Sequence, residues 1–270
     1  MVFLAEPLQY QFFVHGLLAA LLVGSLCGLL GVYIVLRQMS YIGHGLSHAV
    51  FGGAVVSHLL GVNVYMGAGL WGFGAAVLIH RLTARRDLHA DAAIGIVTTA
   101  SFAIGVALMS RVHRFTQDFE ALLFGNVLGV STADLILIAV VTTLTGLTVL
   151  TLYKQLLFSA FDEAVAQVAG VPTRWVRLLF ALVLALAILA SMQVLGVTLI
   201  AATIVIPAAT ARLLTNSFST MLWLSTGLGA VTALTGMYLS YYLDIASGAS
   251  IVLFATVLFV SLLGMTRRSA

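Results

Sequence analysis

A series of apolar segments, each about as long as a membrane-spanning helix, constrains the fold of this 270-residue chain more than any other feature. A helix needs about 20 predominantly apolar residues to cross the hydrocarbon layer of a membrane. The segments that meet this requirement are, in chain order, 12–36, 42–60, 65–82, 92–110, 131–153, 176–194, 196–214, 220–241 and 248–266. Because only the stretch 193–196 separates the sixth segment from the seventh, the count is eight or nine. The sequence therefore predicts an all-α, polytopic helical membrane protein.

The composition excludes several other classes of protein. Hydrophobic residues make up 61% of the chain and charged residues 8%, whereas a soluble globular protein carries about 25% charged residues. So few charges cannot cover a surface that faces water, which excludes a soluble enzyme and a disordered chain. The net charge of +3 does not indicate a nucleic-acid partner, because the basic residues are scattered between the apolar segments. With no polar or proline-rich linker, residues 1–270 are predicted to form a single transmembrane domain.

The positions of the basic residues predict the orientation of the chain in the membrane. Cytoplasmic loops of membrane proteins are enriched in Lys and Arg. If Arg37 is cytoplasmic and the segments alternate in direction, ten of the 12 basic residues fall on the cytoplasmic side, and only Arg111 and Arg114 do not. We therefore expect the N-terminus outside and the C-terminus inside, which requires an odd number of spans.

Two connecting loops, 119–129 and 159–170, have the pattern of short helices. In the second loop, Ser159 is placed to cap the first turn, and Asp162 and Glu163 favour the positive end of the helix dipole. This helix of about ten residues is too short and too polar to cross a membrane. On the predicted topology it lies on the cytoplasmic surface, whereas 119–129 lies at the outer face.

His44 and His48 are the strongest candidates for a site inside the predicted spans. An ionisable residue within a span costs about 2.5–3.5 kcal/mol on insertion scales and is a functional candidate by default. At a spacing of four residues the two histidines share one helix face, where two imidazoles can bind a divalent ion such as Zn²⁺ or Mn²⁺. The alternative is structural, with each imidazole bonded to a backbone carbonyl or a neighbouring span. The sequence leaves both interpretations open.

Asp244, between the last two spans and near the outer face, would complete a His–His–Asp set of ligands. The alternative is that Asp244 caps the last span from its loop. The histidines follow Arg37 by seven and eleven residues, which places them about 10–16 Å along the helix from the cytoplasmic end. The three side chains therefore meet only if a span is broken or the outer loop dips inward, as happens in transporter sites.

Pro207 is predicted to kink the seventh span, because it leaves the carbonyl of Thr203 without its helical partner. Such a kink is typical of a hinge or a pathway lining, and a fixed bend is the alternative. A phosphate loop of the form G-x-x-x-x-G-K-[ST] is absent from the sequence, since the single lysine, Lys154, follows a tyrosine. An H-E-x-x-H motif is absent as well. The sequence indicates a transport protein rather than an enzyme.

Five stretches together resemble the signatures of one family, and they are, in chain order, 37–53 (RQMSYIGHGLSHAVFGG), 122–135 (LLFGNVLGVSTADL), 161–170 (FDEAVAQVAG), 197–212 (VTLIAATIVIPAATAR) and 244–252 (DIASGASIV). The family is that of the membrane permease subunits of ABC importers for zinc, manganese and ferrous iron. The resemblance covers nearly the whole chain and implies a type II-like ABC importer permease fold.

The resemblance also implies roles for individual residues. The cytoplasmic segment that docks onto the ATPase is expected at Asp162, Glu163, Ala164 and Gly170. The metal site is expected at His44, His48 and Asp244. Apart from the resemblance, the pathway and its hinge are expected at Ser47, Thr203 and Pro207. The family commonly has Asp where this chain has His44. An imidazole in place of a carboxylate favours borderline metals, so this difference slightly favours zinc as the cargo.

The resemblance also implies a set of partners for this chain. Permeases of this kind pair as homodimers in the bacterial cytoplasmic (inner) membrane, surrounded by lipid, with ATP-binding subunits below and an extracytoplasmic metal-binding protein above. No permanently bound cofactor and no nucleic acid are expected: ATP binds the partner subunit, and zinc or manganese, or less favourably ferrous iron, is the cargo. The alternative function is a stand-alone secondary metal-ion transporter or channel, which would work without an ATPase.

Overall fold

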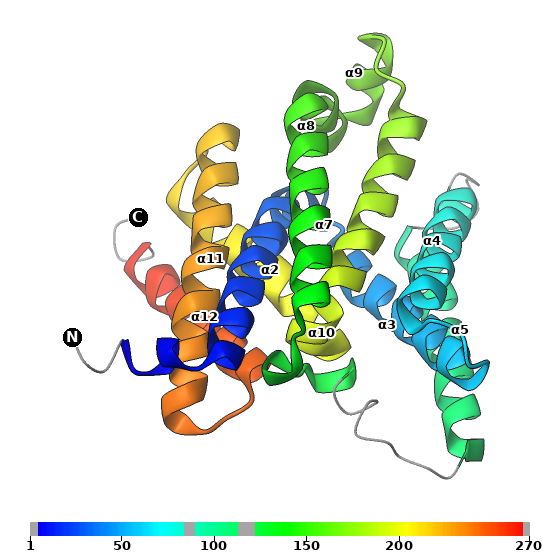
Figure 1. Ribbon diagram of the computed structural model, residues 1–270. Coiled ribbons are helices and arrows are strands. Elements are labelled where there is room, and N and C mark those ends of the chain that lie inside the picture. The colour runs from blue at the N-terminus through cyan, green and yellow to red at the C-terminus, as the bar shows by residue number, and fades with distance from the viewer. Residues whose placement is uncertain (1–4, 84–89, 113–121, 267–270) are drawn as a thin grey trace.

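The computed structural model describes residues 5–83, 90–112 and 122–266, and within these ranges the chain is helical and contains no β-strand (Figure 1). The long helices are α2 (Gln11–Leu36), α3 (Ser40–Leu59), α4 (Val64–Thr83), α5 (Ala90–Val112), α7 (Thr132–Thr151), α10 (Thr173–Leu214), α11 (Phe218–Leu243) and α12 (Ser247–Thr266). The short ones are η1 (Pro7–Gln9), η2 (Val127–Gly129), α8 (Tyr153–Phe161) and α9 (Glu163–Val168). The prediction of an all-α protein is confirmed.

The long helices coincide with the predicted membrane spans. Six of them, α2, α5, α7, α10, α11 and α12, are long and apolar enough to cross a membrane by length and composition. The 20-residue helices α3 and α4 coincide with the second and third predicted spans but are less apolar, because glycine and histidine occupy many of their positions. The 42-residue helix α10 leaves the helical conformation at Gly196 (φ 69°, ψ 156°), so it consists of two arms, 173–195 and 197–214. The break falls at the predicted boundary between the sixth and seventh spans.

Two groups of helices make up the molecule. Helix α2 packs against α7, α10 and α11, and α12 packs against α10 and α11. Helix α3 packs against α4 and α5, and this three-helix group contacts the rest of the described chain chiefly through α10. Figure 1 shows the α3–α5 group on one side of α10, and α2, α11 and α12 on the other. Helix α10 is therefore the element through which the two groups can influence each other.

Two glycines let α2 and α11 approach closely. A Cβ atom at Gly24 would lie 2.3 Å from the carbonyl oxygen of Gly229, and one at Gly28 would lie 2.3 Å from that of Ser225. The Ser225 hydroxyl donates to the carbonyl oxygen of Gly28 at 2.6 Å. The small-xxx-small pattern at 24–28 therefore serves helix packing within the chain, where small residues bring backbones into contact.

The loop before α7 differs from the single short helix expected over 119–129. Residues 119–121 lie outside the described ranges, and the next three form one helical turn that ends at Gly125, whose φ of 82° no continuous helix allows. The amide of Asn126 donates to the carbonyl oxygen of Gln193 at 2.8 Å. The loop therefore lies against the end of the first arm of α10, where the helix break has freed a backbone acceptor.

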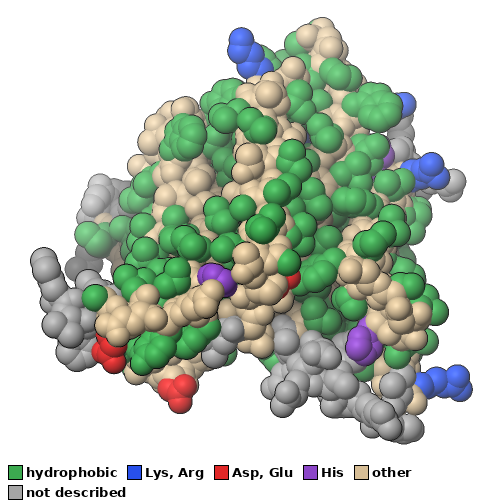
Figure 2. Space-filling model, viewed as in Figure 1, with side chains coloured by type: hydrophobic (Ala, Val, Ile, Leu, Met, Phe, Trp, Pro, Cys, Tyr) green, Lys and Arg blue, Asp and Glu red, His purple; other side chains and the backbone are tan. Residues whose placement is uncertain are grey.

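The surface in Figure 2 is dominated by apolar side chains, as expected of a protein that faces lipid. Most of the Lys and Arg side chains visible on this face lie towards the end that holds α8 and α9 (Figures 1 and 2). The acidic side chains visible on the same face lie towards the opposite end. On this face, the two ends of the helix bundle thus differ in charge.

Candidate metal site and coupling segment

His44 and His48 face each other on α3, as their spacing predicts. Their Nε2 atoms are 3.0 Å apart, and the ring planes are nearly perpendicular at 88°. Two imidazoles bound to one ion at about 2.0–2.1 Å place their nitrogens about 2.9–3.4 Å apart, depending on the angle at the metal. The observed separation therefore needs little change for both Nε2 atoms to bind the same divalent ion.

The residues around His44 and His48 orient the two imidazole rings but do not bury them completely. His48 packs edge-on against the ring of Phe102 in α5, with 4.5 Å between centroids, and both histidines are half-buried. Nδ1 of His48 is buried and has no hydrogen-bond partner in the described part of the chain. Ser47, fully buried between the two, donates its hydroxyl to the carbonyl oxygen of His44 at 2.8 Å. Ser47 thus stabilises the helix turn that carries the histidines and does not itself present a ligand to them.

Asp244 lies in a different part of the molecule. It ends α11 in the left-handed conformation (φ 52°, ψ 48°) and lines a cavity of about 470 Å³ together with Asn126, Tyr241 and Ser247. No residue of α3 lines this cavity. Within the three described ranges, no three His, Cys, Asp or Glu side chains gather closely enough to hold a metal ion. The structure therefore brings His44 and His48 together but leaves Asp244 apart from them.

Pro207 lies in the second arm of α10, buried beside α2. The only residue of α10 with non-helical φ and ψ is Gly196, so the backbone at Pro207 stays helical. The Thr203 hydroxyl donates to the carbonyl oxygen of Leu199 at 3.1 Å, one turn earlier. The break in the helical conformation of α10 is at Gly196, where glycine alone accepts the required φ, and the kink at Pro207 stays a prediction.

The short helix predicted over 159–170 is present as α9 but begins later than expected. Asp162, not Ser159, caps α9: its carboxylate accepts from the amides of Ala164 and Val165 at 2.9 and 3.0 Å. Ser159 belongs to α8 and instead accepts a hydrogen bond from Arg37 at 2.7 Å. The reason is that α8 continues through Phe161, so the first free helix amides lie beyond Asp162.

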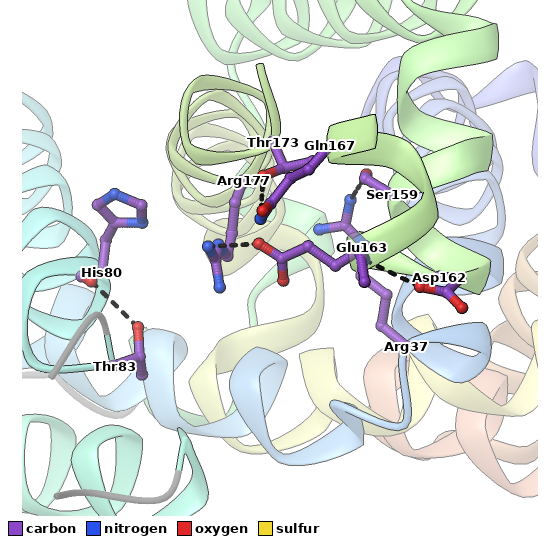
Figure 3. Close-up of polar contacts among 10 residues, drawn as sticks. Arg37, His80, Thr83, Ser159, Asp162, Glu163, Gln167, Thr173 and Arg177 are labelled. Carbon is purple, nitrogen blue, oxygen red and sulfur yellow. Dashed lines mark hydrogen bonds and ion pairs between the residues drawn. The ribbon is translucent and has the colours of Figure 1, made fainter. Parts of the chain in front are cut away.

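One ion pair ties α9 to α10. Glu163 lies 2.6 Å from Arg177, and Figure 3 shows the two side chains pointing towards each other. Gly170 follows α9 with a φ of 80° and lets the chain turn into α10. Around this turn, Val168 is 92% exposed and Trp175 72% exposed. These two apolar side chains therefore point away from the rest of the described chain.

A polar network that the sequence did not suggest joins three helices at the opposite end. The Tyr65 hydroxyl of α4 donates to Asp134 of α7 at 2.8 Å and also contacts the side-chain oxygen of Gln193. Gln193 in turn donates to Asp134 at 3.2 Å, and Ser131 completes a capping box with Asp134. The only signal in the sequence was the Ser131-x-x-Asp134 spacing, since the contacts with Tyr65 and Gln193 bridge distant parts of the chain.

The comparison with known families matches residues 9–266 to the ABC 3 transport family. This chain belongs to that family. The manganese transport system membrane protein MntC of Listeria innocua is 39% identical to it over 259 residues, which are 96% of this chain and 92% of that protein. A Haemophilus influenzae relative named "Probable iron transport system membrane protein" is 36% identical over 264 residues, 98% of this chain and 97% of that one.

The fold of this ABC 3 chain agrees with a solved relative. The structure of PsaBC from Streptococcus pneumoniae in complex with Fab contains a chain that superposes with a TM-score of 0.86 at 34% identity, covering 96% of this chain and 94% of that one. The resemblance found in the sequence is thereby confirmed: the chain is a multi-pass membrane permease subunit of a metal ABC importer. ATP hydrolysis lies on a separate subunit, so the permease itself is not an enzyme.

Proposed function

We propose that this permease passes manganese into the bacterial cytoplasm through a homodimer in the inner membrane. The observation that carries the proposal is the pair of Nε2 atoms 3.0 Å apart on α3, within the membrane domain. Relatives from Listeria and Streptococcus that carry manganese in their names support this cargo. Zinc is the second candidate, because two imidazoles suit a borderline metal, and ferrous iron is the third.

The two separated ligand groups suggest successive binding stations. In the proposed orientation, with the N-terminus outside and the C-terminus inside, an extracytoplasmic binding protein releases the ion at the cavity that contains Asp244. A carboxylate suits a hydrated Mn²⁺, and the neutral imidazoles of His44 and His48 then replace part of its water. Pro207 and Thr203, in the arm of α10 beside α2, are the proposed hinge. Because each of the two sites would bind the ion only weakly, the ion can leave each site as well as bind to it.

Competition between metals for uptake tests which metal ion the permease transports. In vesicles that contain the permease with its ATPase and binding protein, unlabelled manganese is expected to reduce uptake of labelled manganese at lower concentrations than zinc. His44→Asp, which restores the ligand common in the family, should increase the preference for manganese about tenfold, the lower end of the effect of altering a metal site's surroundings. If zinc competes more strongly than manganese in both the wild type and His44→Asp, the cargo is zinc and not manganese.

We also propose that α9 and its flanking residues form the contact with the ATPase. Asp162 fixes the start of α9, Glu163 holds it to Arg177, Ala164 is exposed on its first turn, and Gly170 lets the chain leave it. The exposed apolar side chain of Val168 supports a protein partner at this surface.

Charge reversal at Glu163 tests the coupling segment. Glu163→Arg places two arginines side by side and should reduce the ATPase that co-purifies with the permease by up to about fivefold, since a partly exposed pair contributes at most about 1 kcal/mol. The double exchange Glu163→Arg with Arg177→Glu restores the pair and should restore the yield. Unchanged co-purification and unchanged coupled ATP hydrolysis in the single variant would argue against this contact.

A further inference from the structure

A second cavity, of about 290 Å³, lies at the end of the molecule that holds α8 and α9, between α3 and α4 on one side and α8, α9 and α10 on the other. Figure 3 shows its polar wall, with His80 of α4 opposite Arg177 of α10, and Arg37 beside Ser159. The remaining wall is apolar and consists mainly of Ile42, Leu46, Ala76, Ile79, Phe180 and Ala181. Glu163 also lines the cavity and is paired with Arg177, so Arg37 supplies the unpaired positive charge beside this hydrocarbon surface.

The guanidinium of Arg37 forms no ion pair that the described chain shows, although the carboxylate of Glu163 lies on the same cavity wall and raises the pKa of Arg37. Its guanidinium donates to the Ser159 hydroxyl at 2.7 Å and stacks over the ring of Phe180, 4.7 Å from the centroid. Glu163 instead pairs with Arg177 at 2.6 Å. Burial, and then the positive charge of Arg177, lower the pKa of Arg37 to about 10. Arg37 is half-buried, and its buried Nε has no hydrogen-bond partner in the described part of the chain. Such a guanidinium is costly, and an anion in the cavity would reduce that cost.

The two parts of the wall together define the chemistry of the anion. Arginine side chains bind phosphate through strong, charge-assisted hydrogen bonds. The volume of about 290 Å³ lies just below the range of about 300–1,000 Å³ typical of drug-sized ligands, so a headgroup fits better than a large metabolite. The apolar residues of α3 and α4 would remain uncovered by a simple ion or an acidic side chain, but they suit an acyl chain.

We propose that this cavity binds the phosphate of an anionic phospholipid, with Arg37 as its main partner and an acyl chain along Ile42 and Ile79. Basic pockets between membrane helices on the cytoplasmic side bind lipid headgroups in this way. The inference goes beyond metal transport and uses only the proposed orientation, in which the basic end faces the inner leaflet. The lipid would bridge α3, which carries the histidine pair, and the segment that contacts the ATPase.

The test measures lipid bound to the permease–ATPase complex. The complex is placed in nanodiscs of phosphatidylcholine with phosphatidylglycerol, and native mass spectrometry counts the phosphatidylglycerol that it retains. The wild-type complex should retain phosphatidylglycerol selectively, and Arg37→Gln should weaken its binding about tenfold or more. Arg37→Lys, which keeps the charge, should bind at an intermediate level. Arg212→Gln removes an exposed arginine that does not line the cavity, and it should bind like the wild type.

A second variant tests the apolar part of the cavity, and the size-exclusion profile of each variant complex separates loss of the site from loss of the fold. Ala76→Phe fills the apolar part of the cavity without changing any charge, and it should also reduce the retained phosphatidylglycerol about tenfold. Retention at the wild-type level in both Arg37→Gln and Ala76→Phe would overturn the proposal.

Two further outcomes would assign the cavity to a different occupant. Displacement of the lipid by inorganic phosphate or glycerol phosphate at millimolar concentration would make a free phosphate compound the ligand. Weaker co-purification of the ATPase in Arg37→Gln, with phosphatidylglycerol binding unchanged, would place an acidic side chain of the ATPase there. Either result would overturn the lipid assignment.

Discussion

Replacement of His48 by alanine is expected to lower metal uptake by the complete transporter about 100-fold. Disturbing the residues that merely support a metal ligand costs about 10–100-fold in affinity or activity, and the loss of a ligand itself should reach the upper end. His48 is half-buried, and its ring contacts those of Phe102 and His44, so removing the imidazole should leave the fold intact. The measurement is the initial rate of manganese uptake at equal amounts of permease in the membrane.

His58 provides a matched control for this experiment. It lies on the same helix as His48, near the other end of α3, and is exposed. His58→Ala removes an imidazole from α3 without touching the pair, and uptake should stay within about twofold of the wild type, as for surface substitutions worth less than about 0.5 kcal/mol. Uptake by His48→Ala at the level of His58→Ala would remove His48 from the pathway.

Replacement of Gly196 by alanine is expected to destabilise the folded permease by about 3 kcal/mol or more. The observed φ of 69° and ψ of 156° are open only to glycine, and such backbone strain costs about 1–3 kcal/mol. The added Cβ would also lie 2.4 Å from backbone atoms of Leu123, Phe124 and Gly125, which no side-chain rotation can relieve. Backbone strain and steric overlap both arise from the added Cβ, so the expected loss exceeds that from strain alone.

Thermal unfolding of the purified protein, followed by size-exclusion chromatography, measures this loss. Gly146→Ala in α7 is the matched control, since a Cβ there meets nothing within 4 Å and alanine favours a helix over glycine. We expect Gly146→Ala to unfold at or above the wild-type temperature, and Gly196→Ala to lose most of its monodisperse peak. Equal stability of the two variants would show that the break at Gly196 is not required for the fold.

The features that depend on local sequence were predictable. The apolar segments marked every long helix, and even the boundary inside α10 fell where the break occurs, because a span cannot continue much beyond about 20 residues without reversing or leaving the membrane. The four-residue spacing of His44 and His48 was enough to bring their rings together, since one helix face carries both. Such inferences need no knowledge of how the helices pack.

The features that depend on packing were not predictable. Ser159 was expected to cap a helix but binds Arg37, which is 122 residues away in the sequence. Asp244 matched the metal-site motif, yet the packing of α11 leaves it in a cavity that α3 does not reach. The cavity beside Arg37 likewise forms only when α3 and α4 meet α8 and α10. Contacts of this kind follow from tertiary structure and leave no periodic signal in the sequence.

Manganese uptake by vesicles that contain this permease, with and without its ATPase subunit, tests the central claim most directly. With the ATPase, the binding protein and ATP present, labelled manganese should accumulate, and removal of either ATP or the ATPase should abolish the accumulation. Uptake by vesicles that contain the permease alone, driven by an ion gradient, would contradict an ATP-driven importer and identify a secondary transporter instead.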